Sequence, residues 1–246
     1  MNWMDEGIVI GAKRHGERQI ITTLLTKGHG RHKGIFRPSK ATKSTCECGT
    51  VVQATWSARL REHLGSWALE PLYSPLAFVL HNPLALKALN SACILLEVCL
   101  PEREAAPKVY TAFRHLIHDF ENLSKNDSSF LKAYCYFELF LLEHAGIPLD
   151  FKTCAVTGEQ DNLYYVSPRT GRAVSREVGE PYKDKLLLLP AFLQGSDKQQ
   201  KELDPQEILA ALALSGYFLN KYVFVPHDIN PPEARHRLLA SLENIR

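Results

Sequence analysis

The feature that most constrains the fold is a series of short strand-like runs in the sequence up to residue 75. The runs are rich in β-branched and apolar residues, and glycine-containing turns separate them, which is typical of antiparallel strands. About five such strands fit a small closed barrel of the OB type better than a sandwich, which needs about seven. An SH3-like barrel fits the same pattern. The expected strands are 7–13, 19–26, 31–37, 51–60 and 66–73.

Positive charge is concentrated in the segment 13–43, where Glu17 is the only acidic residue. The first 80 residues carry a net positive charge and the remainder a net negative charge, so the two parts face different partners. A basic face on a small sheet is a candidate groove for a nucleic-acid backbone, although a solvated lysine-rich surface is the simpler alternative. The candidate nucleic-acid-binding residues are Lys13, Arg14, Arg18, Arg31, Lys33, Arg37, Lys40 and Lys43.

Aromatic and imidazole side chains in this region have different expected roles. Trp56 and Trp67 lie on predicted strands and are expected in the barrel core. Phe36, beside Arg37, is the aromatic residue we expect to be available for stacking on bases. His29 and His32 are expected to be polar groups at the surface.

After Pro75 the pattern becomes helical. Asn82 and Pro83 predict the start of a largely buried helix, and Pro101 predicts the start of the next, with acidic residues in its first turn. Further helices are expected after residues 127–129, 204 and 230, whereas 162–167 and 172–175 predict a hairpin. The sequence therefore predicts an α+β chain, with a barrel domain at 1–80 and a helical bundle domain at 81–246 that contains a hairpin segment at about 151–182.

Several classes of protein are disfavoured. No apolar run approaches the roughly 20 residues of a membrane span, and the N-terminus lacks the pattern of a signal peptide. We therefore expect a cytoplasmic protein, and in that compartment the six scattered cysteines are not expected to form a disulfide framework. Glycine-rich phosphate loops and paired catalytic residues are absent, which argues against an enzyme and predicts no cofactor.

The order of several short motifs resembles the bacterial RecO recombination-mediator family over essentially the whole chain. The motifs are Arg14-x-Gly16-Glu17, Thr26, Gly30, the basic stretch, Cys154–Gly158 and the hairpin at Gly171. The resemblance implies an N-terminal OB fold, a helical domain and a non-enzymatic role in recombinational repair. It implies binding of single- and double-stranded DNA, annealing of complementary strands and, with RecR, loading of RecA onto strands coated by single-strand-binding protein.

The resemblance implies two further sites to compare with this sequence, one for zinc and one for a partner's tail. Many members hold zinc with four cysteines, but the matching positions here are Cys154, Thr157, Ser175 and Val178. One thiolate cannot hold a structural zinc, so we predict a degenerate, zinc-ribbon-like hairpin without metal.

Members also capture the acidic tail of single-strand-binding protein on the helical domain. The matching positions are Phe137 and, in place of a basic residue that is Tyr136 here, Lys132 one turn earlier. An alternative function, from another class, is a protein-interaction adaptor whose barrel does not itself bind nucleic acid.

Overall fold

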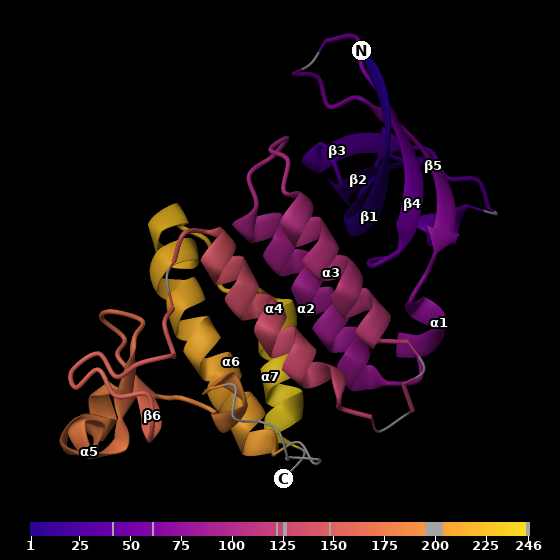
Figure 1. Cartoon of the computed structure of the whole chain (residues 1–246). Coiled ribbons are helices and arrows are strands. Elements are labelled where there is room, and N and C mark those ends of the chain that lie inside the picture. Colours follow the sequence, from indigo (N-terminus) through magenta and orange to yellow (C-terminus); the bar gives the residue numbers. More distant parts are fainter. Residues whose placement is uncertain are drawn as a thin grey trace. The chain divides into compact units, whose positions relative to one another are not determined.

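The computed structural model describes residues 1–40, 42–60, 62–121, 123–124, 127–147, 149–194 and 204–244. The chain is α+β, with five strands at the N-terminus followed by helices (Figure 1). It divides into two compact units, Met1–Phe130 and Leu131–Arg246. The first unit thus includes helices as well as strands, and the domain division expected at residue 80 stays a prediction.

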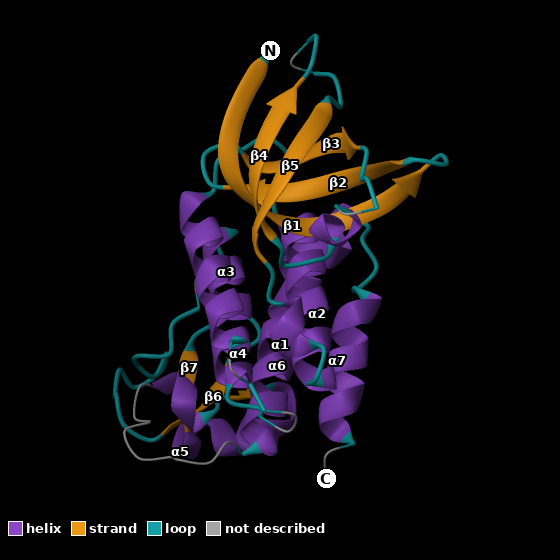
Figure 2. Cartoon of the chain, turned by 90° about the vertical axis from the view of Figure 1, so that its right-hand side faces the viewer, coloured by secondary structure: helices purple, strands orange, loops and turns teal. Residues whose placement is uncertain are grey.

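The first unit contains a closed five-stranded barrel with the strand order β1-β2-β3-β5-β4 (Figure 2). Every pairing is antiparallel except that of β3 with β5, which meet at Ile35 and Ser66. The strands are β1 Asn2–His15, β2 Gln19–Thr26, β3 Gly30–Phe36, β4 Val51–Ser57 and β5 Ser66–Tyr73. The bounds expected for β2 and β5 are confirmed, whereas β1 starts earlier and β4 ends earlier than expected.

β1 is long because it serves two neighbours. Its first half pairs with β4, from Asn2 opposite Ser57, and its second half pairs with β2, as far as His15 opposite Gln19. The register shifts near Gly11, and such a bulge bends a strand and increases its twist. One bent strand therefore closes the barrel.

Aromatic side chains fill the barrel core. Trp56 and Trp67 are 1% and 5% exposed, as expected from the sequence, and each indole N–H donates to a backbone carbonyl. Phe36 is also buried in this core. The expectation that Phe36 stacks on bases is therefore wrong, because the alternation of β3 points this ring inward.

The segment 101–106, which follows α2 (Pro83–Cys99), is extended and is not the expected start of a helix. Arg103 has a left-handed φ of 63°, and its N–H donates to Arg31 O at 2.8 Å, so the segment pairs with the edge of β3. Gly30 makes this approach possible, since a Cβ there would lie 1.7 Å from Glu104 O. The helix α3 begins at Pro107 and ends at Asp119.

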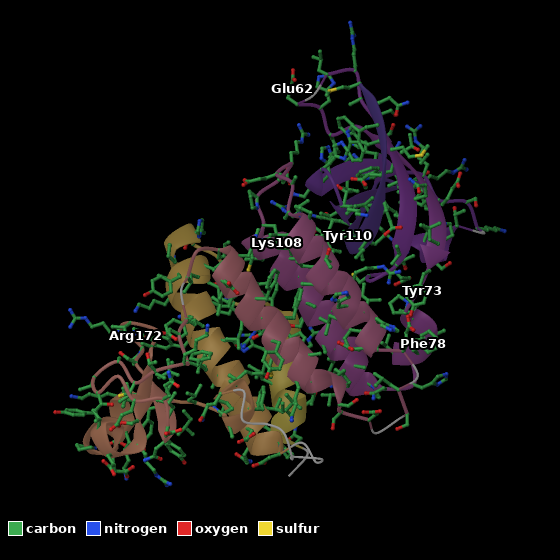
Figure 3. The ribbon with its side chains drawn as sticks, viewed as in Figure 1. Glu62, Tyr73, Phe78, Lys108, Tyr110 and Arg172 are labelled. Carbon is green, nitrogen blue, oxygen red and sulfur yellow. The ribbon has the colours of Figure 1, made fainter. Side chains whose placement is uncertain are left out.

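Polar contacts fix the helices of the first unit. Asn82 caps α2 by accepting from the Ala85 N–H, and its amide donates to Ser124 O and Asp127 O. Tyr110 reaches from α3 towards the barrel (Figure 3), where its hydroxyl donates to the Glu6 carboxylate of β1. Two short helices, α1 Leu76–Val79 and the 3-10 turn η1 Lys43–Cys46, complete the unit.

The second unit is helical and carries a small three-stranded sheet of order β7-β6-β8, which contains the predicted hairpin. Asp204 caps α6 and Pro205 is its first residue, as expected. The α-helices are α4 Phe130–His144, α5 Arg176–Gly179, α6 Pro205–Leu219 and α7 Glu233–Glu243. The strands are β6 Leu163–Val166, β7 Ala173–Ser175 and β8 Leu187–Leu188. The other helical segments are the 3-10 helices η2 Glu180–Lys185, η3 Ala191–Gln194 and η5 Val225–His227 and the π-helix η4 Asn220–Phe224.

One helical segment in the described part of the chain, Pro205–His227, is long and apolar enough to cross a membrane by length and composition alone. The sequence expectation that no run approaches this length is wrong, because the helix continues through Pro226. Half of its most apolar window is buried inside the protein, which is typical of a core helix, so the segment is weak evidence for a membrane span.

Candidate nucleic-acid interface

Six of the eight candidate cations surround two neighbouring loops at one end of the barrel, and all six are exposed. Strand register explains the grouping, because Arg14 lies opposite Ile20, which in turn lies opposite Phe36. The end of β1 is therefore separated from the end of β3 by one strand, β2. Figure 2 shows the β1–β2 hairpin, which projects from the barrel. We call this set the cationic loops: Lys13, Arg14, Arg18, Arg37, Lys40 and Lys43.

Ion pairing distinguishes the cationic loops from the cations on β3. In the part of the chain that the structure describes, no carboxylate forms an ion pair with any of the six side chains. With its amide oxygen turned towards Arg37, Gln19 accepts hydrogen bonds from Nε and Nη2 at 3.2 and 3.1 Å. That contact joins the start of β2 to the residue that follows β3.

The other two candidates, Arg31 and Lys33, lie on β3 and are paired with an acid. Glu102 Oε1 lies 2.5 Å from Lys33 Nζ and 3.4 Å from Arg31 Nη1, and Arg31 Nε donates to Leu100 O at 2.7 Å. The hydrogen bond from Lys33 and the charges of both cations hold the pKa of Glu102 below its usual range. A phosphate must compete with this carboxylate, so the structure separates these two residues from the cationic loops.

A second feature of the barrel is an aromatic hollow, which the sequence analysis missed. It has a volume of about 360 Å³ and its lining includes Trp3, His29, His32, Trp56 and Arg103. His32 is 5% exposed, so the expectation of a surface histidine is wrong. His32 on β3 lies opposite Leu24 on β2, on the face that points to the core. The alternation of side chains along β3 is the sequence signal that could have predicted this burial.

The ring of His32 is desolvated and lacks a polar partner. Burial, and then the charges of Arg103 and His29, lower the pKa of His32 from 6.5 to about 4, so the imidazole is neutral near pH 7. Neither ring nitrogen has a hydrogen-bond partner among the described residues. His29, by contrast, lies 2.9 Å from the Asp5 carboxylate and stacks on Trp3.

The two candidate residues for a partner's tail lie on α4 of the second unit. Phe137 is 4% exposed and belongs to the core. Lys132 Nζ lies 5.6 Å from the centre of the Phe192 ring, and the Tyr136 hydroxyl donates to Phe192 O at 2.7 Å. The accessible surface at this point therefore combines Lys132, Tyr136 and η3, whereas Phe137 supports it from inside.

The four positions matching the family's zinc ligands hold one buried thiol. Burial alone raises the pKa of Cys154, but hydrogen bonds from Thr157 and Ser175 outweigh it and lower the pKa to about 6. The Ser175 N–H donates to Sγ at 3.3 Å. No group of three or more potential metal ligands occurs in the described part of the chain, and the absence of zinc stays a prediction.

Comparison with known proteins identifies relatives along most of the chain. Residues 1–72 match the family model described as recombination protein O N terminal, and residues 80–228 match recombination protein O C terminal. The DNA repair protein RecO of Rhodospirillum centenum is 43% identical over 243 residues, or 97% of this chain and 94% of its own length. The proteins of that name from Wolbachia pipientis and Sinorhizobium medicae are 38% and 36% identical; they match 98% and 100% of this chain and 99% and 97% of their own lengths.

Proposed function

Because the chain belongs to the RecO family, we propose that its role in DNA repair and recombination consists of binding DNA strands through the cationic loops. We assign the barrel to the OB fold, since its closed five-stranded order β1-β2-β3-β5-β4 matches that architecture. We further propose that the protein is cytoplasmic, makes and breaks no covalent bond, and binds both single- and double-stranded DNA.

The observation that carries this proposal is the grouping of the cationic loops at one end of the barrel. Each phosphate neutralised by a lysine or arginine releases condensed counterions, so the logarithm of affinity falls linearly with the logarithm of salt concentration. Contacts with phosphates do not depend on the base sequence, so they suit a protein that binds strands of many different sequences. Annealing requires two strands whose charge is screened and whose bases are exposed. Because the cationic loops would screen this charge, we include annealing in the proposal.

A titration of a fluorescent single strand, by anisotropy at several salt concentrations, tests the interface. Arg14→Ala combined with Arg37→Ala is expected to weaken binding to all sequences and to reduce the salt slope by about one unit for each lost phosphate contact. The matched control, Lys183→Ala with Arg237→Ala, removes the same charge from exposed positions of the second unit. An unchanged slope in the first variant, or equal losses in both, would remove the cationic loops from the interface.

The same titration separates the alternative function, an adaptor whose barrel binds only protein. Such an adaptor gives no binding at low salt. A DNA-binding barrel gives binding that weakens steeply as salt is added.

We also propose the family's partners for this chain: RecR, the C-terminal tail of single-strand-binding protein and, through them, RecA. The positive charge of Lys132 on α4, beside Phe192, supports a site for an acidic tail. Lys132→Ala is expected to weaken binding of a labelled acidic peptide ending in Phe. His144→Ala, an exposed position at the end of the same helix, is the control.

A further inference from the structure

The aromatic hollow is formed where β1 begins, beside the turn between β2 and β3. Trp3 of β1 and His29 of that turn stack with ring centroids 3.8 Å apart and an interplanar angle of 8°. His32 meets Trp56 and Trp3 edge to face, at 4.7 and 5.2 Å. Four ring systems thus surround one opening, and planar molecules pack well against such walls.

The hollow also contains polar groups without partners. Both nitrogens of His32 are buried in the wall and unpartnered among the described residues, so a ligand in the hollow meets other atoms of the ring. A buried polar atom without a hydrogen bond costs about 1–3 kcal/mol. The neutral imidazole therefore contributes an uncharged ring to the wall of the hollow.

Positive charge lies at the rim. Arg103 lines the hollow and donates to the carbonyls of Glu62 and His63, in the loop before β5 that Figure 3 marks at Glu62. The α-ammonium of Met1, another lining residue, donates to Ala58 O. These contacts hold the Arg103 guanidinium and the Met1 ammonium beside the opening. Positive charge at the rim favours a ligand whose negatively charged group stays at the rim while another part enters the hollow.

We propose that the hollow receives one unstacked nucleobase of a single strand held by the barrel. A nucleotide within a strand supplies the flat ring of its base and a phosphate on each side of its sugar. An apolar protein side chain would not use the positive charge at the rim, and the volume of about 360 Å³ has room for a purine. The inference rests on the proposed function and adds a stacking site to its electrostatic contacts.

The test uses the whole wild-type chain and two fluorescent strands of about 12 nucleotides, within the range that one OB fold covers. One strand carries thymine bases and the other carries abasic sugars with the same phosphates. We expect the strand with bases to bind about 5- to 100-fold more tightly. Equal affinities would overturn the nucleobase site but leave the proposed function intact, whereas no binding of either strand at low salt would overturn both.

Substitution locates the site. Trp3→Ala and, separately, His29→Ala are expected to remove most of the preference for bases while leaving the affinity for the abasic strand unchanged. Met4→Ala is the matched control, because Met4 is the next residue on β1 and is 66% exposed. A base preference that persists in both variants overturns the proposal.

A further measurement uses only the wild-type protein, so it remains informative if Trp3→Ala does not fold. A strand with one 5-iodouracil, irradiated in complex with the wild-type protein, is expected to cross-link to peptides containing Trp3, His29 or Trp56. Cross-links confined to other peptides would assign the base to a different site and overturn the proposal.

Discussion

Glu138 of α4 and Arg235 of α7, 97 residues apart in the chain, form a buried two-point ion pair in the second unit. Arg235 Nε and Nη2 donate to the two carboxylate oxygens at 2.8 and 2.9 Å. Tyr134 and Ser215 also donate to this carboxylate, and Arg235 further donates to Leu212 O. Because the pair joins α4, α6 and α7, it fixes how these three helices pack.

Arg235→Ala is expected to lower the free energy of unfolding by about 3–5 kcal/mol, because it leaves the carboxylate of Glu138 buried and unpaired. Urea denaturation followed by circular dichroism measures the change. Replacing both residues by apolar ones of similar size, Glu138→Leu with Arg235→Met, is expected to cost less than the single substitution. A loss below about 1 kcal/mol for Arg235→Ala would contradict this account.

Gly30→Ala is expected to destabilise the first unit more than Gly16→Ala. Both glycines have left-handed φ angles, 68° and 70°, so both substitutions carry the backbone cost of about 1–2 kcal/mol. At Gly30 the new Cβ also meets Glu104 O, whereas at Gly16 no atom lies within 4 Å. Equal urea midpoints for the two variants would show that the segment 101–106 moves away without cost.

Stability is expected to fall as the pH drops from 6.5 towards 4, with a contribution from His32. The unfolded chain binds a proton on this ring near its ordinary pKa of 6.5, but the folded ring binds one only near 4. Folding therefore carries no penalty from this group above pH 6.5, and below it the penalty grows by up to about 1.4 kcal/mol per pH unit.

Subtracting the pH profile of His32→Phe isolates this contribution from the carboxylates that titrate in the same range. Urea denaturation at steps of pH measures both profiles. Identical slopes for the two proteins between pH 6.5 and 4 would contradict the low pKa.

Glu102→Gln is expected to raise the affinity for single-stranded DNA and to steepen its salt dependence, because the substitution releases Arg31 and Lys33 from their shared carboxylate. Glu104→Gln removes an equal charge at an exposed position two residues away and is the control. Anisotropy titrations at several salt concentrations measure both effects. A response that is the same in both variants would reflect overall charge and not the release of these two residues.

The sequence predicted those elements whose signals are local. The bounds of β2 and β5 follow from apolar runs between turn residues, and the starts of α2 and α6 follow from Asn82 and Asp204, whose side chains accept hydrogen bonds from the first turn. The grouping of the cationic loops could also be anticipated, because all six residues flank turns of one short segment.

The sequence-based predictions fail where contacts between residues distant in sequence determine the local structure. Pro101 and its acidic neighbours resemble the first turn of a helix, but pairing with Arg31 holds this segment extended. Burial of Phe36 and His32 depends on the register of β3 within a closed barrel, which neighbouring residues do not reveal. The aromatic hollow likewise joins Trp3 to residues from three other parts of the chain.

The length of β1 sets a scale for any strand that uses both ends of the barrel. Its 14 residues run from Asn2, next to Trp3 and the hollow, to His15 in the hairpin that bears Lys13 and Arg14, a contour of at most about 45 Å. Oligonucleotides too short to bridge this interval can occupy one end or the other but not both. Affinity should therefore rise abruptly at a threshold length, within the roughly 4–16 nucleotides that a single OB fold accommodates.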